Sequence, residues 1–384
     1  MSARIVVVGN HPRAGENVAG ALRQVEYEVL LLEMSREIGG TLLQHAPDCI
    51  IIDLDHTSSS GLELIALLRQ GVLQEPIPII ALCPEEATEH QVRALDAGAN
   101  LCLHKPWRHT ELLSNVAVQL RLWRLQTELQ HQNDINQSLL TKLKMDLSLG
   151  QQVQQSFLPP IQMRTENFSI EARFIPSGDL SGDYFDYRLI TPERLALFLA
   201  DISGHGVASA LLAGRLKSFF DENFKRAHRP RFLLEKLNQV LIALGEHYHI
   251  ATAVFAHIDL AETVLTYSSA GHRNLYWLDT ETGQQTELSA SGPALGMFEE
   301  YEIQEVQRSF LPGRNRLVAF TDGLVEFKLP DGSWHTEEQF CEDAMFPRYA
   351  EQIDQYVNGL LYKSREQNQF RNWEDDVSLI VTDF

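Results

Sequence analysis

The sequence predicts a multidomain protein. We expect an N-terminal α/β domain with a doubly wound parallel sheet, a long connecting helix, and a C-terminal α+β domain in which helices flank a β-sandwich. Three observations predict this. Residues 1–118 alternate apolar runs with helical spacing, residues 119–158 form one long helical pattern, and residues 159–384 are rich in strand signals around a helix pair. The length of 384 residues fits two or three folding units.

The N-terminal segment contains five short apolar runs, each followed by a stretch with helical spacing. Such alternation is typical of βαβ units, in which parallel strands are joined by crossover helices. We therefore expect a five-stranded parallel sheet with helices on both faces, flavodoxin-like in its order. The expected strands are Ile5–Val8, Tyr27–Leu31, Cys49–Ile52, Ile77–Leu82 and Ala99–Leu103.

The second segment predicts one helix from about Asn115 to Phe157, with Gly150 as its single internal glycine and no proline. Five leucines share one heptad seam, with Gln132 and Asn136 as polar layers; they are Leu122, Leu125, Leu129, Leu139 and Leu143. This spacing favours a dimerising two-stranded coiled coil. The alternative is a helix that packs on one of its own domains. A proline pair at 159–160 ends the helix.

The third segment places strand signals early and late, with two helical stretches between them. The expected helices are 208–220 and 232–244; the expected strands are Phe168–Phe174, Leu195–Leu199, Thr252–Asp259, Thr263–Ser268, Arg316–Phe320 and Val377–Val381. Antiparallel strands around a helix pair indicate an α+β domain with packed sheets.

The composition excludes several classes of protein. The net charge is −20, and residues 159–384 carry 20 basic and 34 acidic side chains, a net −14. This excess argues against nucleic acid as a partner, because phosphate backbones repel an anion. No apolar run approaches the roughly 20 residues that span a bilayer, so we expect a soluble, cytoplasmic protein without a membrane partner. The four cysteines show no CxxC spacing, which argues against a zinc or disulfide framework.

Four short acidic motifs follow or precede expected strands of the C-terminal segment. They are Ser181-Gly-Asp183-Tyr-Phe-Asp186, Asp201-Ile-Ser-Gly-His-Gly206, Thr321-Asp322-Gly323 and Asp375-Asp376-Val377. Taken singly, each is also explained as a turn or a helix cap. Together they predict carboxylates on one rim of a sheet, where like charges need cations between them. Hard oxygen ligands suit Mg²⁺ or Mn²⁺.

These motifs, in this order, resemble the metal-dependent PPM-type (protein phosphatase 2C-like) serine/threonine phosphatases. The match is to the bacterial branch that controls sigma-factor partner switching. Three further stretches agree with it: Gln154-Gln-Ser-Phe-Leu-Pro159, Ala270-Gly-His272 and Gly292-Pro-Ala-Leu-Gly296. The resemblance covers roughly residues 150–384.

The resemblance implies a site with two Mn²⁺ or Mg²⁺ ions. Asp201 would bridge both ions, and the backbone carbonyl of Ile202 would be a further ligand. Asp322 and Asp375 would complete the shell of one ion, and Asp183 would support the other, directly or through water. Such an ion pair activates water for in-line attack on phosphorus, so no covalent phosphoenzyme is expected.

Other residues have less specific signals. His205 is the expected acid for the serine leaving group, with His272 as a second candidate; a structural role in a glycine-rich turn is the alternative for both. Asp376 and Asp186 are expected to hydrogen-bond beside Asp375 and Asp183. The sequence identifies no arginine that binds phosphate.

The N-terminal segment resembles a two-component receiver domain. Asp53, at the end of the third expected strand, would be the phosphoacceptor, and Lys105, before Pro106, would contact the phosphoryl group. Three positions depart from the receiver pattern: Gly9-Asn10 replaces the acidic pair, Cys83 the Thr/Ser, and Cys102 the aromatic switch. Without the acids, Mg²⁺ loses most of its ligands, which favours a pseudo-receiver that works without phosphorylation.

Two functions follow from these resemblances. The first is a metal-dependent phosphatase, controlled by the receiver, that dephosphorylates phosphoserine on a small protein such as an anti-sigma-factor antagonist. A sigma factor or a histidine kinase is a further expected partner, and residues 119–158 would join a homodimer. The second is a non-catalytic adaptor, because the layout also resembles RssB-type stress-sigma-factor regulators, some with degenerate phosphatase domains. The presence of Asp183, Asp201, Asp322 and Asp375 together favours catalysis.

Overall fold

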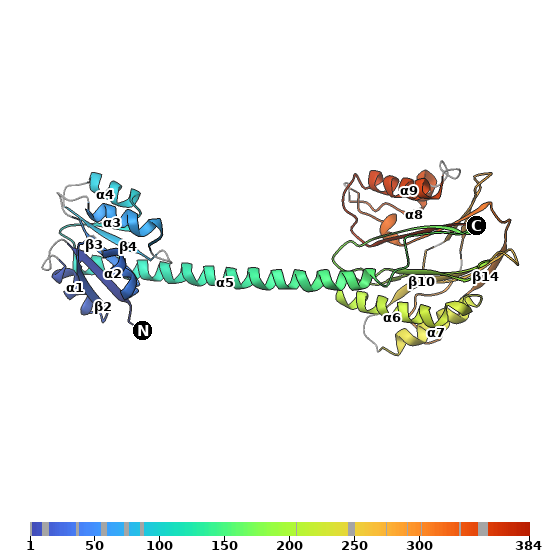
Figure 1. Cartoon of the computed structure of the whole chain (residues 1–384), viewed down its shortest axis with the longest axis horizontal. Helices are drawn as coiled ribbons and strands as arrows, with labels where there is room; N and C mark the ends of the chain where they lie inside the picture. The colour runs from blue at the N-terminus through green and yellow to red at the C-terminus, as the bar shows by residue number, and fades with distance from the viewer. Residues whose placement is uncertain are drawn as a thin grey trace. The chain divides into compact units, whose positions relative to one another are not determined.

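The chain folds into two compact units, residues 1–141 and 142–384, in the computed structural model (Figure 1). Helix α5, His109–Gln155, belongs to both. No helix of the described chain is long and apolar enough to cross a bilayer. The structure describes residues 2–9, 15–35, 38–54, 60–72, 77–84, 88–204, 206–244, 250–273, 275–289, 291–300, 302–329, 332–344 and 352–384.

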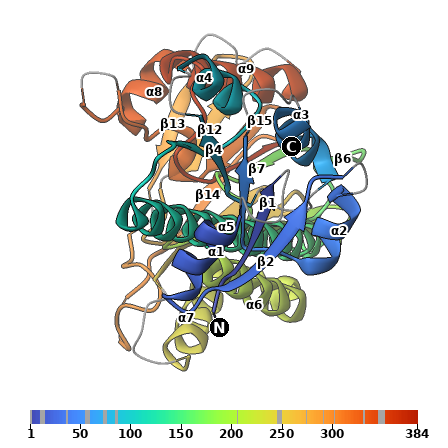
Figure 2. The same cartoon turned by 90° about the vertical axis from the view of Figure 1, so that its left-hand side faces the viewer.

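The first unit is a five-stranded parallel sheet in the order β2-β1-β3-β4-β5, and it faces the viewer in Figure 2. Its elements are β1 (Arg4–Gly9), α1 (Glu16–Arg23), β2 (Glu28–Glu33), α2 (Ile38–His45), β3 (Cys49–Asp53), α3 (Ser60–Leu67), the π-helical turn η1 (Leu68–Val72), β4 (Ile79–Cys83), α4 (Thr88–Asp96) and β5 (Leu101–His104). This order confirms the predicted doubly wound sheet.

Both faces of this sheet are covered, which explains why its central strands are apolar throughout. Helices α2, α3 and α4 pack on one face, through Leu42, Ile65 and Ala94 among others. Helix α1 and the first turns of α5 pack on the other face, where Leu112 and Val116 are fully buried. The first three turns of α5 are therefore part of the core of this unit.

The second unit contains a five-stranded sheet, β14-β11-β10-β9-β8, and a six-stranded sheet, β13-β12-β15-β16-β7-β6. Its strands are β6 (Gln162–Arg164), β7 (Ser169–Ile175), β8 (Tyr184–Thr191), β9 (Arg194–Ile202), β10 (Ala251–Asp259), β11 (Val264–Ala270), β12 (Leu275–Asp279), β13 (Gln285–Leu288), β14 (Glu305–Ser309), β15 (Asn315–Phe320) and β16 (Val377–Asp383). Its helices are α6 (Val207–Asn223), η2 (Phe224–Arg226), α7 (Pro230–Ile242), η3 (Asp322–Leu324), α8 (Glu337–Ala344) and α9 (Ile353–Gln367).

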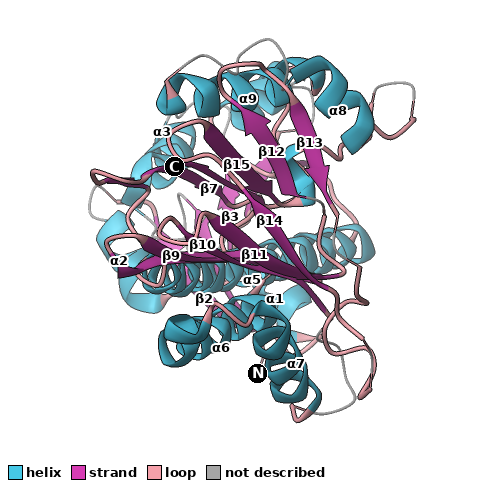
Figure 3. Cartoon of the chain, turned by 90° about the vertical axis from the view of Figure 1, so that its right-hand side faces the viewer, coloured by secondary structure: helices cyan, strands magenta, loops and turns pink. Residues whose placement is uncertain are grey.

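Three apolar cores hold these layers together. The inner faces of the two sheets share one core, which includes Leu197, Val254 and Ile380. Helices α6 and α7 cover the outer face of the first sheet, and α8 and α9 cover that of the second (Figures 1 and 3). Every pairing within these two sheets is antiparallel. The predicted α+β sandwich flanked by helices is confirmed.

The fold contains several elements, and one cysteine pair, that the sequence pattern does not predict. Strands β6, β8, β12, β13 and β14 and helices α8 and α9 were not expected. The structure joins Cys83 and Cys102 in a disulfide, with Cα atoms 6.3 Å apart, a single pair that the cysteine spacing does not indicate. The cause is tertiary: the two cysteines end up on the adjacent strands β4 and β5, whose register pairs Ala81 with Cys102.

Candidate metal centre

Strand β9 carries Asp201 at its C-terminal end. Asp201 and Ile202 are the last two residues of β9, where Asp201 pairs with Thr252 of β10 and Ile202 with Ala251. The backbone then turns through glycines into α6. The Asp201 side chain is only partly buried, whereas Ile202 is in the apolar core below it. This placement keeps the carboxylate at the strand end while its neighbour anchors the backbone.

Asp183 lies directly before β8 and is almost fully buried, with 2% of its surface exposed. The hydroxyl of Thr321 donates a hydrogen bond to its Oδ2 at 2.7 Å. The same Thr321 oxygen accepts from the backbone N–H of Ser378 at 2.9 Å. Thr321 therefore connects Asp183 to the strand ends that carry Asp322 and the pair 375–376.

Asp376 organises the loop in front of Asp183. Its Oδ1 accepts from the backbone N–H and the hydroxyl of Ser177, at 2.7 and 2.9 Å, and its Oδ2 accepts from the N–H of Gly182 at 2.8 Å. Three donors compensate for burying this carboxylate, which is 4% exposed. Asp375 is exposed, and its Oδ1 accepts from the Asp376 N–H at 2.8 Å.

Two glycines allow the loops to approach one another. A Cβ on Gly182 would lie 2.6 Å from the carbonyl oxygen of Ile202. A Cβ on Gly323 would lie 2.2 Å from the carbonyl oxygen of Asp376. Because real Cβ atoms do not come so close to backbone, the loops that carry Asp183 and Asp322 require glycine beside those aspartates.

Burial and neighbouring carboxylates raise the pKa values of three aspartates. The pKa of Asp201 rises to about 7, first because of burial and then because of Asp322 and Asp375. Burial and the charge of Asp201 raise the pKa of Asp183 well above its usual value. Burial and Asp375 raise that of Asp322. Four aspartates from separate segments thus share one electrostatic environment, in which a bound cation would favour their ionised forms.

The donor chemistry fits a hard divalent cation, since it consists of carboxylates and one strand-end carbonyl. Among the described residues, however, no group of three or more His, Cys, Asp or Glu side chains is arranged to hold an ion as it stands. Closing a shell around an ion therefore requires side chains at this edge to move.

Of the two candidate histidines, the structure describes only His272. His205 lies outside the described residues. His272 is buried, and its Nδ1 lies 2.9 Å from the hydroxyl oxygen of Thr252, the residue paired with Asp201. Burial lowers the pKa of His272 to about 4, with a further contribution from Arg273. Its imidazole is neutral near pH 7, which disfavours it as an acid.

Asp186 has different hydrogen-bond partners from Asp183 and Asp376. Its Oδ2 accepts from the Tyr184 hydroxyl at 2.8 Å and from the Lys217 Nζ at 2.9 Å, and Arg188 lies 3.7 Å away. Because Lys217 lies on α6, its contact with Asp186 connects β8 to that helix. The structure thus gives Asp186 a partner on α6, and its role beside Asp183 stays a prediction.

Arg273 is a further residue near these aspartates that the sequence motifs do not indicate. This arginine follows the end of β11, and it lowers the pKa values of both Asp201 and Asp322, opposing the effect of burial. Its guanidinium is 2.5 Å from Glu326 and 2.8 Å from Glu337. The only sequence signal was its position directly after the Ala270-Gly-His272 stretch.

In the first unit, Asp53 ends β3 and is buried, and the ammonium of Lys105 forms an ion pair with its carboxylate. The Lys105 N–H also donates to the carbonyl of Cys83 at 2.9 Å. The expected pairing of phosphoacceptor and lysine is thus formed in space. Gly9 ends β1, whereas Asn10 lies outside the described residues.

Known proteins match both units. The family model described as Stage II sporulation protein E (SpoIIE) matches residues 191–384, and that of the response regulator receiver domain matches residues 5–117. The phosphoserine phosphatase RsbP of Bacillus subtilis is 32% identical over 188 residues, 48% of this chain and 46% of RsbP. This chain thus aligns with less than half the length of that relative.

Two further likenesses concern the second unit. The phosphoserine phosphatase RsbU of Bacillus subtilis is 24% identical over 242 residues, 62% of this chain and 70% of RsbU. The solved SiaA-PP2C domain of Pseudomonas aeruginosa matches with a TM-score of 0.56 at 19% identity, covering 64% of this chain and 98% of that domain. This last likeness shows the PP2C-like fold.

Proposed function

Because the chain belongs to the SpoIIE family through residues 191–384 and carries a receiver domain at 5–117, we propose that it is a metal-dependent protein serine phosphatase. The observation that carries the proposal is that separate acidic loops meet at one edge of the second unit, where Thr321 donates to Asp183 and the glycines at 182 and 323 abut the carbonyls of Ile202 and Asp376. Burial and neighbouring carboxylates raise the pKa values of Asp183, Asp201 and Asp322. Such an arrangement is unfavourable without cations, and perturbed carboxylates of this kind are typical of functional sites.

The proposed ligands are those of the sequence analysis. Asp201, with the Ile202 carbonyl beside it, would hold two Mn²⁺ or Mg²⁺ ions together with Asp322 and Asp375, and Asp183 would support them directly or through water. The ions would supply the Lewis acidity that makes water a nucleophile near neutral pH. Thr321 holds Asp183 by its 2.7 Å hydrogen bond, and Asp376 holds the loop in front of it. His205 stays the proposed proton donor.

The proposed substrate is phosphoserine on a small regulatory protein of a bacterial partner-switching pathway, such as an anti-sigma-factor antagonist. Support comes from the names of RsbP and RsbU, both phosphoserine phosphatases. The acidic second unit would meet an anionic phosphoprotein, so cations at the site also lessen the repulsion between them.

Hydrolysis of a phosphoserine peptide by the full chain, with Mn²⁺ and with EDTA, tests this function. We expect activity that needs the ion and falls at least a hundredfold in Asp201→Ala. Asp179→Ala, an exposed carboxylate in the neighbouring loop, is the matched control and should keep activity. Activity that survives both EDTA and Asp201→Ala would refute the proposal. A chain that binds a partner protein but hydrolyses nothing would instead be the adaptor.

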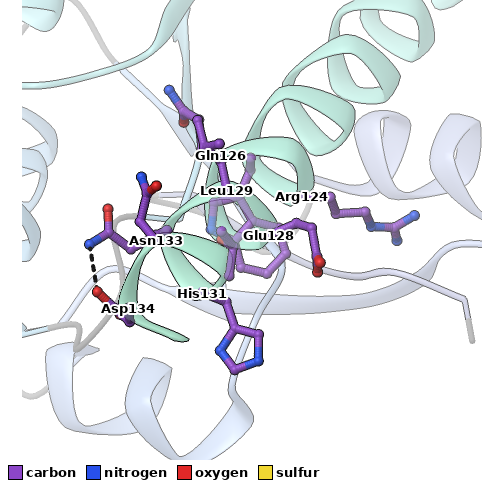
Figure 4. A pocket seen from close by; sticks show the side chains of 10 residues that line it. Arg124, Gln126, Glu128, Leu129, His131, Asn133 and Asp134 are labelled. Atoms are coloured by element: carbon purple, nitrogen blue, oxygen red, sulfur yellow. Dashed lines mark hydrogen bonds between the residues drawn. The ribbon is translucent and has the colours of Figure 1, made fainter. Parts of the chain in front are cut away.

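The long helix supports a homodimer joined through residues 119–158. Its seam leucines are exposed in the single chain: Leu122 by 49%, Leu125 by 59%, Leu129 by 64%, Leu139 by 60% and Leu143 by 55%. Figure 4 shows Leu129 among polar side chains of α5, including Gln126, Asn133 and Asp134. Packing on its own domain does not cover these leucines, whereas a second copy would bury each for roughly 1.5–3 kcal/mol.

For the first unit we propose control of the phosphatase without phosphorylation of Asp53. The Lys105 pair already neutralises this carboxylate, and the acidic pair that would bind Mg²⁺ is absent from the sequence. Incubation with acetyl phosphate and Mg²⁺ should leave the mass of the chain unchanged. A mass increase that disappears in Asp53→Ala would instead make a histidine kinase the expected partner.

A further inference from the structure

Arg273 lies at the same edge as the aspartates. Gly271, two residues earlier, forms a bridge with Ala253 of β10, next to the Thr252 that pairs with Asp201. The side chain of Arg273 is 21% exposed, so the guanidinium is largely enclosed yet reaches solvent.

Two glutamates hold the guanidinium, and they differ in how firmly they are held. Glu337, at the start of α8, is 17% exposed; it accepts from Arg273 at 2.8 Å and from the Tyr276 hydroxyl at 2.6 Å. Glu326 is 45% exposed and lies 2.5 Å from Arg273. Its backbone N–H donates to the Asp322 carbonyl at 2.7 Å, which connects it directly to a proposed ligand.

We infer that Arg273 binds the phosphoryl oxygens of the substrate beside the aspartates, with Glu337 and Tyr276 holding it in position and Glu326 as the partner that phosphate displaces. The inference rests on the proposed phosphatase function. It adds a cationic side chain that contacts the phosphoryl group directly, alongside the metal ligands.

The charges favour this exchange. A phosphomonoester carries about −1.5 to −2 charges near pH 7, against −1 for the Glu326 carboxylate. The planar guanidinium fork binds two phosphoryl oxygens at once, as it binds a carboxylate. The exposed ion pair with Glu326 has little stability to lose, since such pairs contribute roughly 0–1 kcal/mol. The more buried Glu337 keeps the guanidinium oriented while Glu326 moves away.

The second unit contains a matched control. Arg314 also pairs with two acids, Asp279 and Glu281, each at 2.9 Å, and its side chain is 28% exposed. It precedes β15, whereas Asp322 follows the other end of that strand. Arg273→Ala and Arg314→Ala therefore remove comparable ion-pair networks at opposite ends of one strand.

The test is calorimetric titration of the full, Mn²⁺-loaded chain with inorganic phosphate, together with kinetics on a phosphoserine peptide. We expect Arg273→Ala to weaken phosphate binding at least tenfold and to raise KM similarly, with kcat changed less than threefold. Arg273→Lys should lie between wild type and Arg273→Ala. Glu326→Gln should strengthen phosphate binding, because it removes the competing carboxylate. Arg314→Ala should bind phosphate as wild type does.

Wild-type phosphate affinity in both Arg273 variants would overturn the inference, as would an equal loss in Arg314→Ala. If Arg273→Ala fails to fold, Arg273→Lys decides, since it keeps the charge and loses the fork. Unchanged affinity in Glu326→Gln would overturn the exchange with Glu326. If the wild-type chain binds phosphate but hydrolyses nothing, the proposed function fails, and the phosphate titrations still decide the role of Arg273.

Discussion

The side-chain amide of Gln154 makes two hydrogen bonds to the backbone of Ser181. Its Nε2 donates to the Ser181 carbonyl at 2.7 Å, and its Oε1 accepts from the Ser181 N–H at 3.0 Å. Gln154 lies in the last turn of α5 and is 4% exposed. The Ser181 hydroxyl in turn accepts from the N–H of Asp183 at 3.1 Å. The end of the long helix thus holds Ser181, which lies two residues before the proposed metal ligand Asp183.

Gln154→Ala should lower the thermal stability of the second unit and raise the Mn²⁺ concentration that hydrolysis requires. The substitution leaves the N–H and the carbonyl of fully buried Ser181 without this partner, at a cost of roughly 2 kcal/mol. We expect the Tm of the second unit to fall by roughly 6 °C and the Mn²⁺ concentration for half-maximal activity to rise several-fold. Thermal unfolding and a Mn²⁺ titration of peptide hydrolysis measure these effects.

The adjacent, exposed Gln155 supplies the control for this experiment. Gln155→Ala should leave the Tm and the Mn²⁺ requirement unchanged. A Gln154→Ala chain that needs no more Mn²⁺ than Gln155→Ala would mean that the hydrogen bonds to Ser181 do not position Asp183.

Gly323→Ala should displace the loop of Asp322. The new Cβ would stand 2.2 Å from the Asp376 carbonyl oxygen, so backbone must shift. We expect a loss of peptide hydrolysis of at least tenfold, with partial recovery at high Mn²⁺ concentration. Gly178→Ala, where a Cβ meets nothing within 4 Å, is the control. Equal activity in the two variants would show that this close approach is unnecessary.

The metal-free chain should lose stability as the pH rises through 7. The folded state raises the pKa of Asp201 to about 7, chiefly by burial. The protonated carboxyl is favoured on folding, so this contribution is complete below the unfolded value, near 4, and is lost as the pH rises through 7. In EDTA we expect the Tm to fall by roughly 5 °C more between pH 5 and 8 than in Asp201→Asn.

Excess Mn²⁺ should remove or reverse this fall, because divalent ions bind the deprotonated carboxylates. Differential scanning fluorimetry across the pH series, with EDTA and with Mn²⁺, measures both curves. Identical slopes for wild type and Asp201→Asn in EDTA would contradict the raised pKa of Asp201.

A charge on the leucine seam should separate the proposed dimer. Leu129→Asp combined with Leu139→Asp places two carboxylates per chain where the copies would meet, and like charges there repel. We expect light scattering at micromolar concentration to give the mass of a dimer for wild type and of a monomer for the double variant. Leu140→Asp changes a neighbouring, equally exposed leucine off the seam and should stay dimeric. A monomeric wild-type chain would refute the proposed dimer.

Local patterns determined much of this protein from the sequence. The central strands β1, β3 and β4 of the receiver are buried on both faces, so their apolar runs can be recognised in the sequence without knowing which elements cover them. The motifs of Asp183, Asp201, Asp322 and Asp375 combine carboxylates with the glycines and strand ends that position them. These signals lie within a few neighbouring residues of each motif, which is why the fold class could be predicted and the aspartates could be proposed as ligands.

Tertiary structure decided which groups meet. Asp186 follows Asp183 closely in sequence, yet the pleat of β8 carries its carboxylate to Lys217 on α6. Arg273 meets Glu326 and Glu337 because β11, η3 and α8 come to one edge, and no local spacing encodes that meeting. Side-chain periodicity predicts the face on which a residue lies, whereas long-range pairing of strands and loops decides what faces it.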